Sequence, residues 1–290
     1  MVASSERPDA ALSGSLLSGM PNFMCTTCGV QYGDTEVPPQ SCVICSEERQ
    51  YIGWQGQQWT TLDQLRGDHR SRIEPEGSGL TGIGIEPSFA IGQRALHLRT
   101  AGGGFIWDCT SLVDEAAVSK VRQLGGARAM AVSHPHFYSA MVEWSRALGG
   151  IPVYLHEADR AWVMRDDPAI RYWGGGALEV EPGLTLIHCG GHFAGSTALH
   201  WADGADGLGA LLSGDTIMVG QDRRTVSFMY SYPNLIPLDA VAVQRIVAAV
   251  EPFEFEQIYG GWTGKTVREA GKAAIRYSAR RYLRAIGGGD

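Results

Sequence analysis

Four side chains that can bind a metal ion lie at the ends of short predicted strands between residues 134 and 215. His134 and His136 stand at the end of one strand, His192 lies in a glycine-rich loop between two others, and Asp215 ends a further one. Three neutral imidazoles and one carboxylate can fill most of the coordination shell of zinc or iron. Side chains two residues apart in an extended chain point to the same side, so we expect His134 and His136 to face one ion.

The first part of the chain carries a second group of metal-binding side chains. These form two Cys-x-x-Cys pairs, Cys25 with Cys28 and Cys42 with Cys45. Each pair can direct two thiolates at one ion, and four thiolates close a tetrahedral shell with no open position. We therefore predict a structural zinc ribbon over 21–54, with a rubredoxin-like iron site as the alternative. Two disulfides would use the same residues, but the sequence shows no secretion signal, and a reducing cytoplasm keeps thiols free.

The composition narrows the class of protein. Of the 290 residues, 44% are hydrophobic and 19% are charged, and the formal net charge is −7. This is the composition of a globular chain, and it argues against a broadly basic surface for nucleic acid. No apolar run reaches the roughly 18 to 20 residues of a membrane helix. We expect a cytoplasmic protein without a membrane segment and with a disordered tail over 1–20.

From residue 82 onward, the apolar pattern alternates between strands and helices. Strands are predicted at 94–99, 104–109, 129–133, 151–155, 209–213 and 257–259, with a β-rich stretch at 178–201. Helices are predicted at 114–124, 139–148, 238–250 and 265–286, and a further short helix at 61–68 precedes this region. Strands followed by strand–helix pairs, arranged twice, favour a layered α/β sandwich over a single barrel.

Over residues 82–262, these motifs in this order make the chain similar to the metallo-β-lactamase-fold superfamily. The matching pieces are the His134-Pro135-His136 pair after a strand, the loop Gly191-His192-Phe193-Ala194-Gly195-Ser196, the turn Ser213-Gly214-Asp215, and Trp107-Asp108 after an earlier strand. The resemblance implies a four-layer αββα sandwich over 55–290, with a metal site along the shared edge of its two sheets. It also implies that the three histidines hold the first metal ion and that Asp215 takes the place of the bridging carboxylate.

The sequence departs from the superfamily's pattern at the second metal. The superfamily motif continues as His-x-His-x-Asp-His, whereas this chain has Tyr138 and Ser139 at the last two positions. The strand that should supply a final histidine ends in Gly260-Gly261-Trp262. Neutral tyrosine and serine are poor metal ligands, so we predict one metal ion, zinc or iron. Tyr138 could then serve as a proton donor or an oxyanion donor, and Asp215 as a ligand or a base.

These residues favour a hydrolase that directs a metal-bound hydroxide at an ester, lactone, thioester or phosphodiester of a small molecule. Two alternatives use the same side chains. A degenerate site would leave a metal-binding scaffold or an interaction protein without catalysis. Iron held by His134, His192 and Asp215 would instead resemble the persulfide dioxygenase branch of the superfamily.

Two further segments bear on substrates and partners. The aromatic stretch 228–233 is expected to line a substrate pocket or lid, or else to pack against a helix or a second subunit. The last predicted helix carries a basic stripe that repeats every four residues: Arg268, Lys272, Arg276, Arg280 and Arg284. We expect this stripe to pair with the protein's own acidic residues or with a second copy in a homodimer, rather than with nucleic acid.

Overall fold

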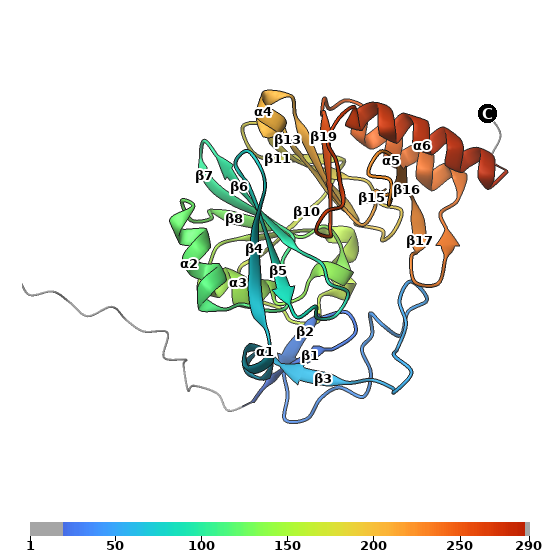
Figure 1. Ribbon diagram of the computed structural model, residues 1–290. Helices are drawn as coiled ribbons and strands as arrows, with labels where there is room; N and C mark the ends of the chain where they lie inside the picture. The colour runs from blue at the N-terminus through green and yellow to red at the C-terminus, as the bar shows by residue number, and fades with distance from the viewer. Residues whose placement is uncertain (1–19, 288–290) are drawn as a thin grey trace, which may run out of the picture.

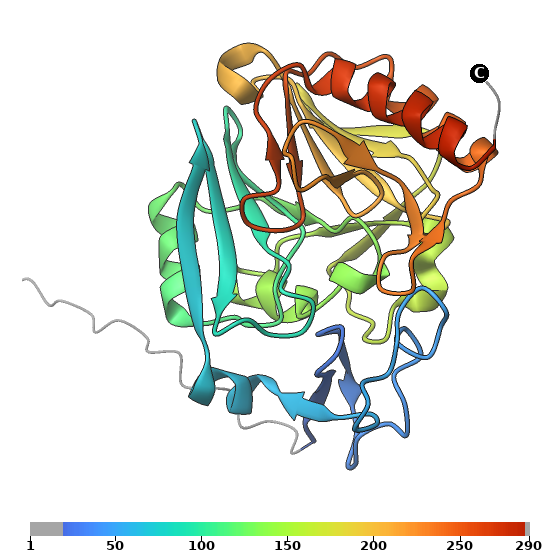
Figure 2. The same ribbon diagram turned by 45° about the vertical axis from the view of Figure 1, so that its right-hand side comes forward.

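The computed structural model describes residues 20–287, so the tail predicted over 1–20 lies outside the described residues except for Met20. Two large β-sheets face each other at the centre of the molecule, each with helices on its outer face (Figure 1). The view turned by 45° shows the same layers with a small N-terminal sheet beneath them (Figure 2). This arrangement is the predicted four-layer αββα sandwich.

The first large sheet has seven strands, in the order β10 (Ile170–Trp173), β9 (Val153–His156), β8 (Ala129–Ala131), β7 (Gly103–Trp107), β6 (Ala95–Thr100), β5 (Leu80–Glu86) and β4 (Arg70–Gly77). Strands β7 to β10 run parallel, whereas β4 to β7 form an antiparallel meander. Its outer face is covered by α2 (Glu115–Gln123) and α3 (Met141–Ala147).

The second large sheet has six strands, in the order β11 (Ala177–Glu181), β12 (Leu184–His188), β13 (Thr197–Trp201), β14 (Ala210–Gly214), β19 (Gln257–Gly260) and β20 (Thr266–Val267). Only β14 and β19 pair in parallel among these strands. Its outer face is covered by α5 (Ala240–Val250) and α6 (Gly271–Ala285).

The remaining elements are short. They are α1 (Leu62–Asp68), α4 (Gly204–Gly207), the 3-10 helices η1 (Pro135–Phe137) and η2 (Glu157–Trp162), and two small ladders, β15 (Met218–Val219) with β16 (Val226–Ser227) and β17 (Met229–Ser231) with β18 (Ile236–Pro237). The 3-10 helix η1 follows β8, η2 follows β9, and the two small ladders lie between β14 and α5.

The two-residue period of the strands sorts apolar side chains into layers. Leu96 and Leu98 of β6 point into the space between the sheets, together with Leu212 of β14. Leu211, the neighbour of Leu212, faces α5 and α6 instead. Because both faces of each sheet are covered, consecutive apolar residues are buried, which explains compact apolar segments such as 209–213.

Aspartate caps begin two of the predicted helices. Asp114 Oδ1 accepts the Ala117 N–H at 2.9 Å before α2, and Asp239 Oδ1 accepts the Ala242 N–H at 2.8 Å before α5. Such bonds satisfy N–H groups that have no partner in the first helical turn. The helices predicted at 114–124 and 238–250 are thereby confirmed, with small shifts at their ends.

The helix predicted over 265–286 is wrong at its start. Thr266–Val267 form β20 and pair with β19, and Ala270 adopts a left-handed backbone with φ of 54°. β-branched side chains suit a strand, and a left-handed residue cannot continue a right-handed helix. The helix therefore begins only at Gly271.

The basic stripe, of which all but Arg268 lies on α6, pairs in part with the protein's own acidic residues, as predicted. Lys272 Nζ lies 2.5 Å from Glu254 Oε1, and Arg276 Nε lies 3.1 Å from Glu251 Oε2. Exposed pairs of this kind add little stability, so the stripe is mainly a solvated face. Within residues 20–287, no helix combines the length and the apolar character needed to cross a membrane.

The N-terminal sheet joins the sandwich through backbone contacts. Its strand order is β2 (Gln31–Asp34), β1 (Asn22–Cys25) and β3 (Trp59–Thr61). The Gln31 N–H donates to Ser139 O at 3.0 Å. Gly29 has φ of 81°, and a Cβ at this position would collide with Ser111 Oγ, so only glycine fits the turn. The predicted boundary between 54 and 55 stays a prediction, although β3 lies beyond it and pairs with β1.

A buried ion pair connects the two large sheets. Arg94 is 1% exposed, and its guanidinium contacts the carboxylate of Glu76 on β4. Its Nη2 also donates to Gly260 O at 3.1 Å, at the end of β19. Burial lowers the pKa of Arg94, and the Glu76 carboxylate opposes that shift. The pair thus holds the end of β19 against the first sheet.

We expect Glu76→Ala to lower the free energy of unfolding by about 3–5 kcal/mol, because it leaves a guanidinium buried without its partner. Glu74→Ala on the same strand is the matched control, since Glu74 pairs with Arg72 at 3.4 Å where the side chains are 44% and 41% exposed. It should cost less than about 1 kcal/mol. Urea unfolding followed by circular dichroism measures both, and equal losses would contradict the structural role of Glu76.

Candidate metal centres

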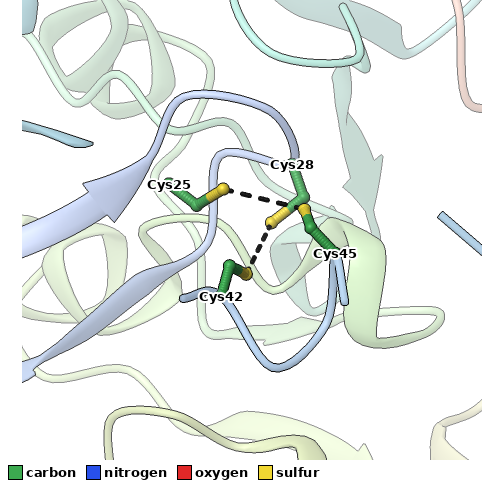
Figure 3. Close-up of side chains that lie close together, drawn as sticks. All are labelled: Cys25, Cys28, Cys42 and Cys45. Atoms are coloured by element: carbon green, nitrogen blue, oxygen red, sulfur yellow. Dashed lines mark hydrogen bonds between the residues drawn. The ribbon is translucent and has the colours of Figure 1, made fainter. Parts of the chain in front are cut away.

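The four cysteines of the ribbon form one buried cluster (Figure 3). Each of them is a free thiol and is at most 2% exposed. The sulfur atoms of Cys25 and Cys45 lie 3.7 Å apart, as do those of Cys28 and Cys42. A disulfide would bring two sulfurs to about 2.05 Å. Tetrahedral zinc with Zn–S bonds of about 2.3 Å separates its sulfurs by about 3.8 Å, so the cluster has the dimensions of a zinc ribbon site.

Polar groups outside the cluster support its sulfur atoms. Tyr32 OH donates to Cys42 Sγ at 3.3 Å, and Gln57 Nε2 donates to Cys25 Sγ at 3.2 Å. Hydrogen bonds from the neighbouring thiols, Cys28 foremost, hold the pKa of Cys25 well below its usual range. The thiolate is the form that binds metal. Because four sulfurs face one another, no position is left for a substrate, and the cluster suits a structural metal.

The four residues of the second centre come from three loops at one end of the two sheets. His134 and His136 follow β8, His192 precedes β13, and Asp215 follows β14. The expected extended geometry of the histidine pair is wrong, because Pro135–Phe137 form the 3-10 helix η1. A proline at the first position fixes φ near the helical value and favours this turn. The two imidazoles nevertheless converge, with ring centroids 5.3 Å apart.

One ligand atom from each of these four residues lies within 4.8 Å of the others. His136 Nδ1 and His192 Nε2 are 3.1 Å apart, and Asp215 Oδ2 lies 3.6 Å from His192 Nε2 and 3.8 Å from His134 Nε2. Nitrogen ligands at about 2.0–2.1 Å from a tetrahedral ion are separated by about 3.3–3.4 Å. The structure therefore brings together all four residues that the sequence singled out, at a spacing that suits one ion.

The outer nitrogen atoms of two imidazoles contact the protein. His134 Nδ1 lies 2.9 Å from Ser133 Oγ, and His192 Nδ1 lies 3.2 Å from Met229 O. A carbonyl oxygen only accepts, so His192 carries its proton on Nδ1 and presents a bare Nε2 to the centre. His134 Nε2 and Asp215 Oδ1 are buried and have no hydrogen-bond partner among residues 20–287. Buried polar atoms without partners are expected where an ion binds.

Burial sets the charge state of the centre. It lowers the pKa of His134 and of His136 well below the usual value, and it lowers the pKa of His192 to about 4. The imidazoles are therefore neutral near pH 7, as metal ligation requires. Burial, together with the neighbouring Asp108, raises the pKa of Asp215 well above its usual value. A cation between the four residues would stabilise the ionised carboxylate.

Two buried aspartates outside the centre hold its loops. Asp108 Oδ1 accepts the Ser133 N–H at 2.7 Å, directly before the histidine pair. Asp159 Oδ1 accepts the Gly195 N–H at 2.8 Å, in the loop that precedes β13. The sequence resemblance included Asp108, whereas no sequence signal marked Asp159. A single aspartate in a loop is common, and its partner is separated from it by 36 residues.

The residues at the second-metal positions make other contacts. Ser139 O accepts the Gln31 N–H of the ribbon. Tyr138 is 2% exposed and packs in the core cluster that the ribbon shares with the first sheet, and its role as a proton donor stays a prediction. A Cβ on Gly261 would lie 2.6 Å from the ring of Phe137. Phe137 therefore fills the space beside Gly261, where the superfamily pattern expects a histidine side chain.

The aromatic segment 228–233 contacts two of the candidate ligands, Asp215 and His192, through Tyr232. Tyr232 OH donates to Asp215 O at 3.0 Å, and its ring centroid is 5.8 Å from that of His192. Phe228 packs edge-on against Tyr282 of α6, at 5.8 Å between ring centroids. Helix packing, one of the predicted alternatives, is thus confirmed for Phe228, while Tyr232 supports a ligand loop.

Arg49 of the ribbon also reaches this centre. Its Nη1 donates to His192 O at 3.2 Å, and its Cζ lies 4.1 Å from the ring centroid of Phe193. Sequence reasoning missed Arg49, because an isolated arginine after a Cys-x-x-Cys pair belongs to no motif. The two partners in the hydrogen bond are 143 residues apart, so no local pattern could have joined them.

The fold is that of solved metallo-β-lactamases. The chain matches DIM-1 with a TM-score of 0.56 at 14% identity, covering 74% of this chain and 98% of that one. It matches TMB-1 with a TM-score of 0.57 at 12% identity, over 74% and 98% of the two chains. It matches the mono-zinc form of FIM-1 from Pseudomonas aeruginosa with a TM-score of 0.53 at 16% identity, covering 74% of this chain and 96% of that one. Similarity at such low identity shows the fold alone: a metallo-β-lactamase fold, here with a four-cysteine ribbon before it.

A relative with much higher identity defines the family. The chain is 46% identical over 269 residues to the uncharacterized protein YmaE of Bacillus subtilis (strain 168). The aligned region covers 92% of this chain and 97% of YmaE. The chain belongs to the same protein family as YmaE. No family model matches the chain.

We expect the purified chain to bind two metal ions, one in each cluster. His136→Ala should remove one ion and leave the ribbon ion, whereas Cys28→Ser should remove the ribbon ion. His200→Gln is the matched control, since His200 is buried but its Nε2 already contacts Glu254 O at 2.8 Å. Elemental mass spectrometry gives the ions per chain. A single ion in the wild type that persists in His136→Ala would show that the histidine centre binds none.

Proposed function

We propose that the chain is a metal-dependent hydrolase with one metal ion held by His134, His136, His192 and Asp215. The observation that carries the proposal is the convergence of three neutral imidazoles and a buried carboxylate at the end of an αββα sandwich. Zinc held by three imidazoles lowers the pKa of its bound water to about 7 and so supplies hydroxide at neutral pH. The metallo-β-lactamases of the same fold support this class of chemistry.

The contacts around the centre support a single ion. The ring of Phe137 lies 4.5 Å from that of His134, and the ring of Trp262 packs against Phe137 with centroids 5.5 Å apart. Gly261 leaves no room for a longer side chain, and Ser139 is engaged with the ribbon. Among the described residues, the histidine centre offers four ligands, which is enough for one ion.

The two oxygen atoms of Asp215 are placed for different roles. Its Oδ2 faces His134 and His192, whereas its Oδ1 is buried without a hydrogen-bond partner among residues 20–287. In this proposal Oδ2 would hold the ion, and Oδ1 would accept the proton of the attacking water. The substrate is a small molecule with an ester, lactone, thioester or phosphodiester bond.

A metal-binding scaffold without catalysis is the second candidate, and burial favours it. The four candidate ligands are each at most 4% exposed. Four protein ligands also complete a tetrahedral shell around zinc, as they do in structural sites, whereas the hydrolase would need a fifth position on the ion for the attacking water. The two candidates differ in whether a substrate ever reaches the centre.

We expect the wild-type chain to hydrolyse at least one member of a panel of chromogenic esters, lactones, thioesters and phosphodiesters. His192→Ala should abolish this activity and keep the ribbon ion. Asp215→Asn should lower kcat by about 100-fold or more, because an amide cannot accept the proton. Turnover assays with elemental analysis of each variant measure both effects, and His200→Gln should retain activity.

Hydrolysis that survives in His192→Ala would contradict the catalytic assignment. A chain that holds an ion in the histidine centre and turns over no member of the panel would support the scaffold. Iron instead of zinc in that centre would favour the dioxygenase alternative, which the same elemental analysis detects.

A further inference from the structure

Residues 46–50 of the ribbon, here called the covering segment, lie against a loop of the histidine centre. In both ribbon views, the blue loop of the ribbon rises to meet the orange strand β17 (Figures 1 and 2). Four hydrogen bonds join the covering segment to residues 230–234. Tyr230 OH donates to Glu47 Oε1 at 3.1 Å, and Ser231 Oγ donates to Arg49 O at 3.0 Å. Asn234 Nδ2 donates to Glu48 O at 2.8 Å and to Gln50 O at 3.0 Å. Three of these bonds go to backbone carbonyls, so they hold the path of the chain itself.

Arg49 forms a second layer over the imidazoles. Its Nη1 donates to His192 O at 3.2 Å, and its Nε pairs with Glu47 Oε2 at 2.9 Å. Its Cζ lies over three rings: Phe193 at 4.1 Å, Tyr230 at 4.9 Å and Trp162 at 5.6 Å. The ring of Phe193 in turn meets His136 edge-on, with centroids 4.9 Å apart. Arg49 therefore packs on Phe193, which in turn packs on His136 of the histidine centre.

This layer is nearly closed to solvent. The side chain of Arg49 is 14% exposed, and that of its partner Glu47 is 19% exposed. Phe193, between Arg49 and the imidazoles, is 1% exposed. A small molecule can reach ligands buried in this way only if an element that covers them moves.

The other end of the covering segment is anchored in the four-cysteine cluster. Ser46 follows Cys45 directly, and its N–H and its hydroxyl both donate to Cys42 O at 2.9 Å. Arg49 is four residues beyond Cys45, a distance that an extended chain spans in at most about 14 Å. The stretch 35–58 contains no helix or strand, so its shape depends on the thiol cluster and on the hydrogen bonds described above. Small metal-bound segments of this kind lose their fold when the metal leaves.

The geometry points to a coupling between the two centres: the metal of the four-cysteine cluster keeps the covering segment closed over the histidine centre, and its release opens that centre. In the closed state the histidine centre keeps its ion and excludes substrates. When a competing metal chelator takes the ribbon ion, residues 46–50 lose their anchor and leave the loop 228–234. The coupling concerns access to the centre and holds whether or not the centre catalyses hydrolysis.

Hydrogen exchange read by mass spectrometry on the full chain tests the closure. Arg49→Ala should raise the exchange rate of the loops 190–196 and 228–234 by about tenfold, through loss of a cation–π contact and a hydrogen bond. Asn234→Ala should also raise the exchange rate of both loops, and it leaves every cysteine and histidine unchanged. Arg66→Ala is the matched control, because Arg66 also donates to a backbone carbonyl, Val113 O at 2.9 Å, but lies on α1. Unchanged protection of both loops in Arg49→Ala and Asn234→Ala would overturn the closure.

The coupling is tested by removal of the ribbon ion. Cys28→Ser alters the first Cys-x-x-Cys pair and leaves the covering segment itself intact. We expect faster exchange at 46–50 and in both loops, together with faster loss of the remaining ion to a chromogenic chelator. Graded chelation of the wild-type chain gives the same readout if Cys28→Ser does not fold. Faster exchange at 46–50 with unchanged loops and unchanged ion loss would overturn the coupling.

Discussion

Asp215 Oδ1 is buried and has no hydrogen-bond partner among residues 20–287. A buried carboxylate in this position must either meet a cation or become neutral, and this constraint organises the histidine centre. Asp215 is 4% exposed and lies near the buried Asp108, with three neutral imidazoles around it. A metal ion is the group that satisfies the carboxylate and the imidazoles together. Two hydrogen bonds help the loops hold these ligands at the right spacing. One joins the backbones of the two sheets, from the Thr197 N–H to Ser133 O at 2.9 Å. The other lies within the first sheet, from the Ser133 N–H to the side-chain Oδ1 of Asp108 at 2.7 Å.

Residues beside the histidine centre contact the ribbon or fill the adjacent space with their side chains. In the superfamily pattern, the positions of Tyr138 and Ser139 would carry ligands of a second ion. Here Ser139 holds strand β2 of the ribbon, and Phe137 fills the volume beside Gly261. The residues at the second-metal positions of the superfamily pattern and the attachment of the ribbon therefore lie in the same short segment. The ribbon then returns to the centre from another side, through Arg49.

A cationic guanidinium beside a cation site would normally weaken metal binding, so the neighbours of Arg49 matter. Glu47 pairs with it at 2.9 Å, and the faces of Phe193 and Tyr230 also stabilise its charge. The covering segment can thus stay closed while the centre holds its ion. Hydrolysis requires this closed arrangement to open, whereas a structural ion does not. The mobility of the covering segment therefore distinguishes the hydrolase from the non-catalytic scaffold.

The sequence by itself determined the features that depend on short chain separations. Two Cys-x-x-Cys pairs, the helix predicted at 114–124 and the alternating apolar strands each depend on residues close together in the chain, and the structure confirms them. The types and order of His134, His192 and Asp215 also marked the end of the sandwich where they meet. Tertiary structure alone decided the pairing of β20 with β19, the bond from the Gln31 N–H to Ser139 O, and the contact of Arg49 with the loop of His192. These depend on residues brought together by the packing of whole sheets, and no local propensity or spacing carries that information.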